Sequence, residues 1–134
     1  MKLLKNNECN VLDSSNIIFF DVDDTLIMWG KKHQEGRLDV IQVEDPFMRG
    51  HVMFFTPHVT HINILKRNSE QGRQIIVWSA AGHIWAKKVV EVLRLEKYVT
   101  LIMEKPSKYV DDKPMEEWHP QRTYLTHDVE GESK

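Results

Sequence analysis

The feature that most constrains this chain is the apolar run Ile17–Phe20, which leads directly into Asp21-Val22-Asp23-Asp24-Thr25. Four apolar residues between polar flanks are typical of a short strand covered on both faces, as in a parallel sheet. Open α/β sheets bind ligands just outside the carboxyl ends of their strands, so the acids are expected at a ligand site. Acids this close together repel one another unless a cation or protons compensate. Their hard oxygens predict a divalent metal, Mg²⁺.

Two further apolar runs, 75–78 and 99–103, alternate with expected helices over 57–72 and 83–95. Thr56 is the expected N-cap of the first helix, which then begins at Pro57 and stops at Gly72. Strands alternating with helices predict an α/β fold built on a Rossmann-like parallel sheet with right-handed crossovers. We expect helices on both faces of that sheet.

The segment between the apolar runs 17–20 and 75–78 predicts a β element separate from the parallel sheet. Residues 30–37 are strongly polar and are expected to form an exposed loop. Two apolar stretches, 38–44 and 52–55, are separated by the turn-forming residues 45–50. This pattern favours a β-hairpin with a broad tip.

A chain of 134 residues with 41% hydrophobic content is long enough for one core, and we expect a single domain over residues 1–127. Residues 128–134 are small, acidic and polar and are expected to form a disordered tail. The formal charge of −2 shows no preference of the whole surface for an anionic polymer. No apolar run approaches the ~20 residues of a membrane helix, and no secretory signal follows the first lysines. With Cys9 as the single cysteine, we expect a cytoplasmic protein without a membrane partner. The sequence leaves homo-oligomerisation open.

The residues that follow the expected strands form a set suited to phosphoryl transfer. They comprise carboxylates, a hydroxyl and a cation: Asp21, Asp23, Ser79, Lys105, Asp111 and Asp112. A carboxylate can attack phosphorus to give an aspartyl-phosphate, and a second carboxylate can move protons. A lysine and a metal can balance the charge of the transition state. The set predicts a Mg²⁺-dependent phosphomonoester hydrolase.

In the same order along the chain, these residues resemble the motifs of the haloacid dehalogenase (HAD) superfamily of phosphohydrolases. The acid stretch matches its first motif, D-x-D-x-T. The resemblance implies that Asp21 is the nucleophile and a metal ligand. It implies that Asp23 is the general acid/base and binds metal through its main-chain carbonyl, while Thr25 supports the loop. Asp24 stands where many relatives of this family have glycine. It is expected neither to attack phosphorus nor to transfer protons.

The remaining motifs of this family resemble 75–79, which ends in Ser79, and 109–112, which is expected to be a short strand that ends in two acids. By that resemblance Asp111 is the third metal ligand and Asp112 lies beside it. The lysine is assigned to Lys105, with Lys108 as second choice. Ser79 and Lys105 are expected to hold the phosphoryl oxygens, together with main-chain groups at Val22 and Ala80.

Many HAD enzymes carry a cap domain that selects small substrates, but the intervals between these motifs leave no room for a large one. A minimal capless member is therefore expected, with the hairpin as a small flap and an open site. Such a site suits a nucleic-acid end, a nucleotide or a phosphoprotein.

The alternative is a HAD-like or receiver-like metal-binding module for signalling or binding, without turnover. Receivers place the acid pair on the first strand and the phosphorylated aspartate on a middle one, which is the reverse of the order here.

Several aromatic and imidazole side chains have simpler expected roles. His58 and His61 are expected to be exposed on a helix, because no third zinc ligand has suitable spacing. Trp78 and Trp85 are expected in the core. Trp29 follows the acid stretch, and the sequence leaves open whether it packs in the core or flanks a substrate.

Overall fold

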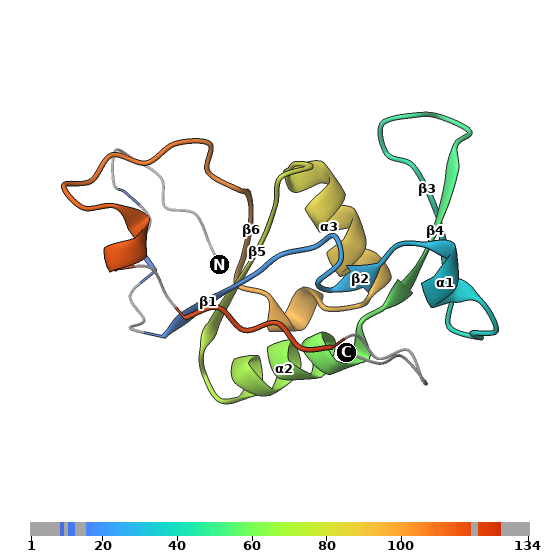
Figure 1. The fold of residues 1–134 in the computed structure, drawn as a ribbon, viewed down its shortest axis with the longest axis horizontal. Coiled ribbons are helices and arrows are strands. Elements are labelled where there is room, and N and C mark those ends of the chain that lie inside the picture. Colours follow the sequence, from blue (N-terminus) through green and yellow to red (C-terminus); the bar gives the residue numbers. More distant parts are fainter. Residues whose placement is uncertain (1–8, 10, 13–15, 119–120, 127–134) are drawn as a thin grey trace.

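The computed structural model describes residues 9, 11–12, 16–118 and 121–126. Three strands form a parallel sheet in the order β1-β5-β6 (Figure 1), and three form an antiparallel sheet in the order β2-β4-β3. The strands are β1 (Ile17–Phe20), β2 (Ile27–Met28), β3 (Ile41–Glu44), β4 (Val52–Pro57), β5 (Gln74–Ser79) and β6 (Leu101–Glu104). The helices are α1 (Lys31–Gln34), α2 (Val59–Glu70) and α3 (His83–Val92), with the 3₁₀ turns η1 (Glu96–Tyr98) and η2 (Met115–Glu117).

The parallel sheet brings the carboxyl ends of its strands to one edge. Phe20 pairs with Val77, and Ser79 pairs with Glu104. Asp21, Ser79 and Lys105 therefore emerge close together, because each stands at or directly after a strand end. The predicted α/β class and the parallel pairing of the three apolar runs are confirmed.

Helices α2 and α3 both lie on one face of the parallel sheet, so the prediction of helices on both faces is wrong for the described residues. Phe20, Ile75 and Val77 point to the same face and belong to one buried cluster with Leu65 of α2 and Val89 of α3. Both crossovers step in the same direction across the sheet, from β1 to β5 to β6, and right-handed crossovers then place both helices on one side.

The other face of the parallel sheet carries a partly exposed aromatic pair. The rings of Phe19 and Trp78 stack with their centroids 4.2 Å apart. Phe19 is 39% exposed and Trp78 is half-buried. Trp78 is therefore only partly a core residue, whereas Trp85 is buried as predicted.

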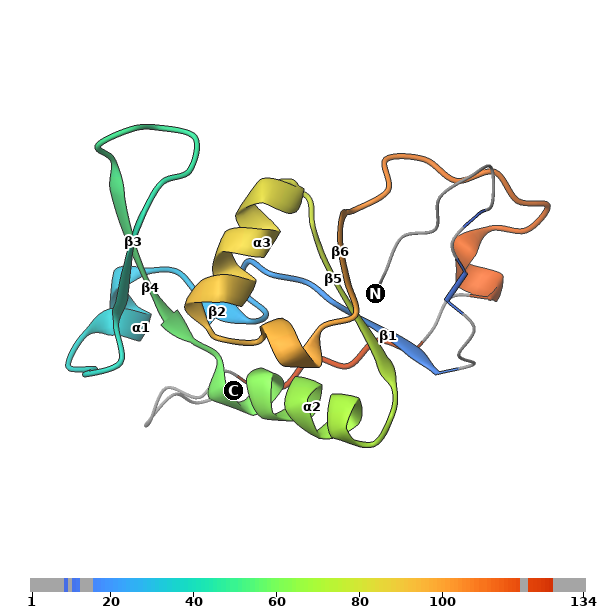
Figure 2. The ribbon, with the colours of Figure 1, turned by 180° about the vertical axis from the view of Figure 1, so that it is seen from behind.

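The predicted hairpin is confirmed as β3 and β4, and Figure 2 shows it projecting beyond the rest of the molecule. Its broad tip is held by Asp45, whose side chain accepts a hydrogen bond from Phe47 N–H at 2.8 Å. The prediction of a loop over 30–37 is wrong in part, because α1 forms one short helical turn there.

Helix α2 begins later than predicted, at Val59, and His58 is its N-cap. The His58 ring accepts a hydrogen bond from His61 N–H at 3.2 Å. Thr56 does not cap the helix, because it pairs with Met28 inside the antiparallel sheet. Helix α2 ends at Glu70, close to the stop predicted at Gly72. Gly72 has a positive φ of 89°, which is typical of a glycine just beyond a helix end.

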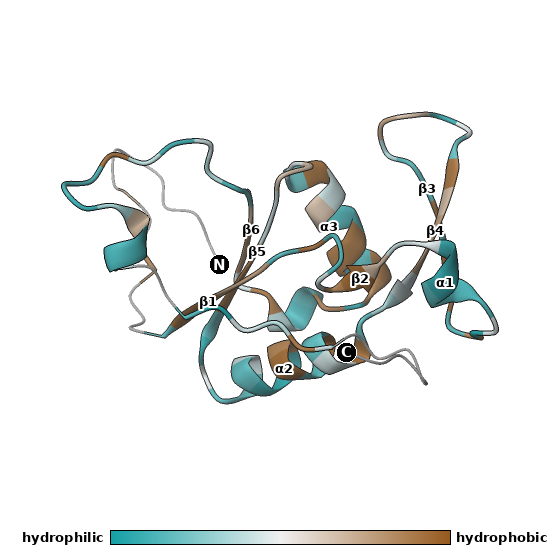
Figure 3. Cartoon of the chain, viewed as in Figure 1, coloured by the Kyte–Doolittle hydropathy of each residue, from teal (hydrophilic) through white to brown (hydrophobic). Residues whose placement is uncertain are grey.

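The chain after β6 does not form the strand expected near 109–112. Figure 3 shows mostly hydrophilic residues along this segment, and its residues 105–112 are exposed. Residues 121–126 then return to residues 21–25 and to α2, where they form hydrogen bonds. The predicted tail, 128–134, lies outside the described residues. Within the described part of the chain, no helix is both long enough and apolar enough to span a lipid bilayer.

Candidate active site

The acid loop, residues 21–25, makes a tight turn at the end of β1. The Val22 carbonyl accepts hydrogen bonds from Thr25 N–H at 3.1 Å and Leu26 N–H at 2.9 Å. Asp24 occupies the left-handed region with φ of 59°, which glycine adopts freely and aspartate tolerates better than most residues. The turn therefore aims the carboxylates on either side of Val22 out of the sheet.

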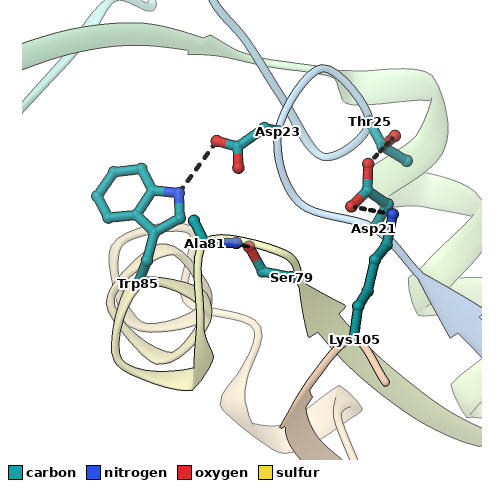
Figure 4. Close-up of polar contacts among 7 residues, drawn as sticks. All are labelled: Asp21, Asp23, Thr25, Ser79, Ala81, Trp85 and Lys105. Atoms are coloured by element: carbon teal, nitrogen blue, oxygen red, sulfur yellow. Dashed lines mark hydrogen bonds and ion pairs between the residues drawn. The ribbon is translucent and has the colours of Figure 1, made fainter. Parts of the chain in front are cut away.

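Asp21 is held between a cation and a hydroxyl (Figure 4). Lys105 Nζ lies 3.2 Å from Asp21 Oδ1, and the Thr25 hydroxyl donates to Asp21 Oδ2 at 3.1 Å. Lys105 is placed there because its N–H donates to the Ser79 carbonyl at 3.1 Å, which extends the pairing of β5 and β6 by one residue. A carboxylate offers about four lone-pair positions, so Asp21 keeps capacity for an electrophile. Of the two candidate lysines, the structure brings Lys105 to Asp21.

Asp23 lies on the other side of the loop in Figure 4, facing Trp85. Its Oδ1 accepts hydrogen bonds from Trp29 Nε1 at 2.9 Å and from Trp85 Nε1 at 3.1 Å. Of the two roles left open for Trp29, the structure shows packing, because its ring contacts Phe55 and Trp85. No sequence signal indicates that either indole would reach Asp23, apart from the position of Trp29 directly after the acid stretch.

Three predicted phosphate contacts have different surroundings. The Ser79 hydroxyl is buried and accepts a hydrogen bond from Ala81 N–H at 3.0 Å, which shapes the turn after β5. The Val22 side chain is fully buried, so only its main chain can face a substrate. Ala80 is exposed at the same edge.

Asp111 and Asp112 are not brought to the acid loop. Both are exposed, and Asp111 Oδ1 accepts a hydrogen bond from Lys113 N–H at 3.1 Å within a local turn. Among the residues that the structure describes, no three acidic, histidine or cysteine side chains gather into a metal-binding group. Mg²⁺ commonly keeps several waters and uses one or two carboxylates of a protein. By donor type, the Asp21 carboxylate and the Asp23 main-chain carbonyl therefore fit Mg²⁺ without Asp111.

A broad groove of about 760 Å³ runs along the outer edge of β1. Its lining includes Asp21, Lys105 and both rings of the Phe19–Trp78 pair. Arg122 of the returning segment adds a second cation. The groove thus combines carboxylates, two cations and an aromatic surface.

A cluster under the acid loop ties it to residues 121–126. Leu125 N–H donates to His61 Nε2 at 2.9 Å, so the proton of a neutral His61 ring is on Nδ1, which donates to the Thr25 carbonyl at 2.8 Å. The His58 and His61 rings stack 3.7 Å apart. Both histidines are buried, so the prediction of exposed histidines is wrong. His61 serves the loop as a hydrogen-bond link that sequence spacing did not reveal.

The Tyr124 hydroxyl completes this link by donating to the Asp24 carbonyl at 2.9 Å. Partial burial, and then the negative charge of Asp24, raise the pKa of Tyr124 above its ordinary value of 10.0. A raised pKa stabilises the fold fully below about pH 10, and this contribution is lost as the pH rises through the folded-state value.

We therefore expect Tyr124→Phe to lower the free energy of unfolding near neutral pH by about 0.5–1.5 kcal/mol, the net value of one hydrogen bond. The difference from wild type should vanish at high pH, because an ionised tyrosine cannot donate a proton. Urea unfolding of both proteins from about pH 8 to about pH 11.5 measures this. A difference that stays constant across that range contradicts the assignment.

Comparison with protein-family models, curated proteins and solved structures found no match for this chain.

Proposed function

We propose that the chain is a Mg²⁺-dependent phosphomonoester hydrolase that works through an aspartyl-phosphate on Asp21. The arrangement that supports this best is the Asp21 carboxylate at the end of β1, with the Lys105 ammonium 3.2 Å away and Asp23 two residues further along. The motif order that resembles the HAD superfamily agrees with it. A catalytic pair of acids beside a cation is the minimum that aspartyl-phosphate chemistry needs.

The two acids divide the reaction between them. An Asp21 oxygen forms a bond to phosphorus while the bond from phosphorus to the ester oxygen breaks. Asp23, protonated at the start, gives its proton to the leaving oxygen. Asp23 then takes a proton from a water that attacks the same phosphorus, which releases phosphate and restores the Asp21 carboxylate. Lys105 balances the negative charge on the phosphoryl oxygens during both steps.

Mg²⁺, held by Asp21 and the Asp23 carbonyl, would draw charge from the phosphoryl oxygens. Asp111 would join as a third ligand only if the exposed residues 106–112 moved toward the acid loop. That requirement is a specific consequence of the HAD resemblance. A change in the protease sensitivity of this segment on addition of Mg²⁺ would support it.

The groove favours a phosphorylated substrate with an aromatic part, such as a nucleotide or a nucleic-acid end. The Phe19–Trp78 pair and Asp21 share this groove. Phe19 and Asp21 are two residues apart in the sequence, and their Cα atoms are therefore at most about 7 Å apart. Stacking of a base on an aromatic side chain contributes about 1–3 kcal/mol.

The test is phosphate release by the purified protein with Mg²⁺ from a panel that includes p-nitrophenyl phosphate, nucleoside monophosphates and 3′-phosphorylated oligonucleotides. Release from any of them supports the proposal. A protein that releases nothing but becomes stoichiometrically phosphorylated by acetyl phosphate supports the signalling module instead. No release and no labelling contradict both.

Lys105→Met is expected to lower kcat/KM by about 10²–10³-fold, because it removes one group that balances charge in the transition state. The matched control is Lys108→Met, which removes an exposed lysine a few residues away and should leave kcat/KM unchanged. Since a partly exposed ion pair contributes about 0–1 kcal/mol, both variants should unfold close to the wild-type urea midpoint. Equal losses in both variants would contradict the assignment of Lys105.

A further inference from the structure

The acid/base candidate Asp23 is bound on one oxygen only. Its Oδ1 accepts both indole N–H groups, from Trp29 at 2.9 Å and from Trp85 at 3.1 Å. Among the described residues, no side chain or main-chain group donates to its Oδ2. The two donors come from separate parts of the fold, since Trp29 follows β2 and Trp85 lies in the first turn of α3.

The two indoles are fixed by packing. Their rings stack with centroids 5.9 Å apart, and Phe55 meets both edge-on at 5.5 Å and 6.2 Å. Phe55 is fully buried and Trp85 is 4% exposed. Neither donor can rotate away without disturbing this aromatic cluster, which we define as Trp29, Phe55 and Trp85.

An indole N–H donates and never accepts. Two such donors therefore hold Oδ1 as a hydrogen-bond acceptor. Oδ2 is then the Asp23 oxygen that remains for a contact with the reacting groups.

We infer that Trp29 and Trp85 are positioning residues that fix Asp23 with Oδ1 as a permanent acceptor and present Oδ2 to the reaction. Oδ2 then gives the proton to the leaving oxygen and takes the next one from water. The inference rests on the proposed function for the reaction itself. The contact between the indoles and Asp23 can be tested without it.

Trp85→Phe keeps an aromatic ring in the cluster and removes one N–H. Loss of one of the two hydrogen bonds that orient Asp23 is expected to lower kcat about 10- to 100-fold with little change in KM, because Trp85 is buried and does not line the groove. Trp29→Phe should act in the same way. Trp118→Phe is the matched control, because it removes an exposed indole directly after η2. It should leave kcat and KM unchanged. Wild-type kcat in both cluster variants would overturn the positioning role.

The structural part is read from the indole ¹⁵N–¹H signals of the four tryptophans. In Asp23→Asn the charge is lost with little change in shape, so the signals of Trp29 and Trp85 should shift and exchange faster with solvent. Those of Trp78 and Trp118 should stay. Asp23→Ala repeats the measurement if the asparagine retains both hydrogen bonds. Unmoved Trp29 and Trp85 signals in both variants overturn the inference, even in an active enzyme. Shifted signals in a protein without phosphatase activity retain the contact and reject the proposed function.

Discussion

Asp21→Asn should abolish phosphate release, with a loss of at least about 10⁴-fold in kcat. An amide oxygen is a poor nucleophile, and the change also removes the negative charge that faces Lys105 Nζ at 3.2 Å. The amide still accepts the hydroxyl proton of Thr25, so the loop keeps its shape. Release of phosphate in the presence of Mg²⁺, measured with the best substrate of the panel, gives the size of the loss.

Asp24→Asn is the matched control for this variant. Asp24 belongs to the same loop and carries the same kind of side chain, but its carboxylate accepts a hydrogen bond from the main-chain N–H of Trp29 at 3.2 Å. Asparagine keeps that acceptor and tolerates the positive φ of the position. Asp24→Asn should therefore retain most of the activity. Full activity in Asp21→Asn, or an equal loss in both variants, rejects Asp21 as the nucleophile.

The strands were predictable because their signal is local. The runs before Asp21 and Ser79 are apolar, short and followed by polar residues, which is typical of buried parallel strands. The start of α2 was not predictable in the same way. Thr56 is a good N-cap by residue type, but its pairing with Met28 places it in a strand. Long-range pairing of this kind overrides local propensity.

The meeting of Asp21, Thr25 and Lys105 follows from predicted strand ends at one sheet edge. The position of Asp111 could not be predicted, because the order of motifs along the chain does not show how close they lie in space. The segment after β6 also has few apolar residues that could pack it against the domain. The indoles on Asp23 were missed for a related reason. A buried tryptophan is predicted by its apolar ring, whereas the partner of its single N–H depends on the tertiary fold.

The second large effect concerns Phe55, which connects the core to the site. Phe55 is fully buried in β4, opposite Ile41, and it contacts both rings that hold Asp23. Phe55→Ala is expected to lower the free energy of unfolding by about 3–5 kcal/mol, the usual cost of a cavity left by a buried ring. This is a large fraction of the roughly 5–15 kcal/mol that a domain has in total. Urea unfolding measures the loss.

Leu38→Ala is the control for this variant, because Leu38 is an apolar residue that is fully exposed. It should change the free energy of unfolding by no more than about 0.5 kcal/mol. Phe55→Leu separates the two roles of the ring, since leucine fills most of the volume but offers no aromatic edge to Trp29 and Trp85. If the cluster positions Asp23, Phe55→Leu should lower kcat more than its modest loss of stability explains. If kcat follows the folded fraction alone, Phe55 supports only the core, and the fixed orientation of Asp23 then depends on the two indoles themselves.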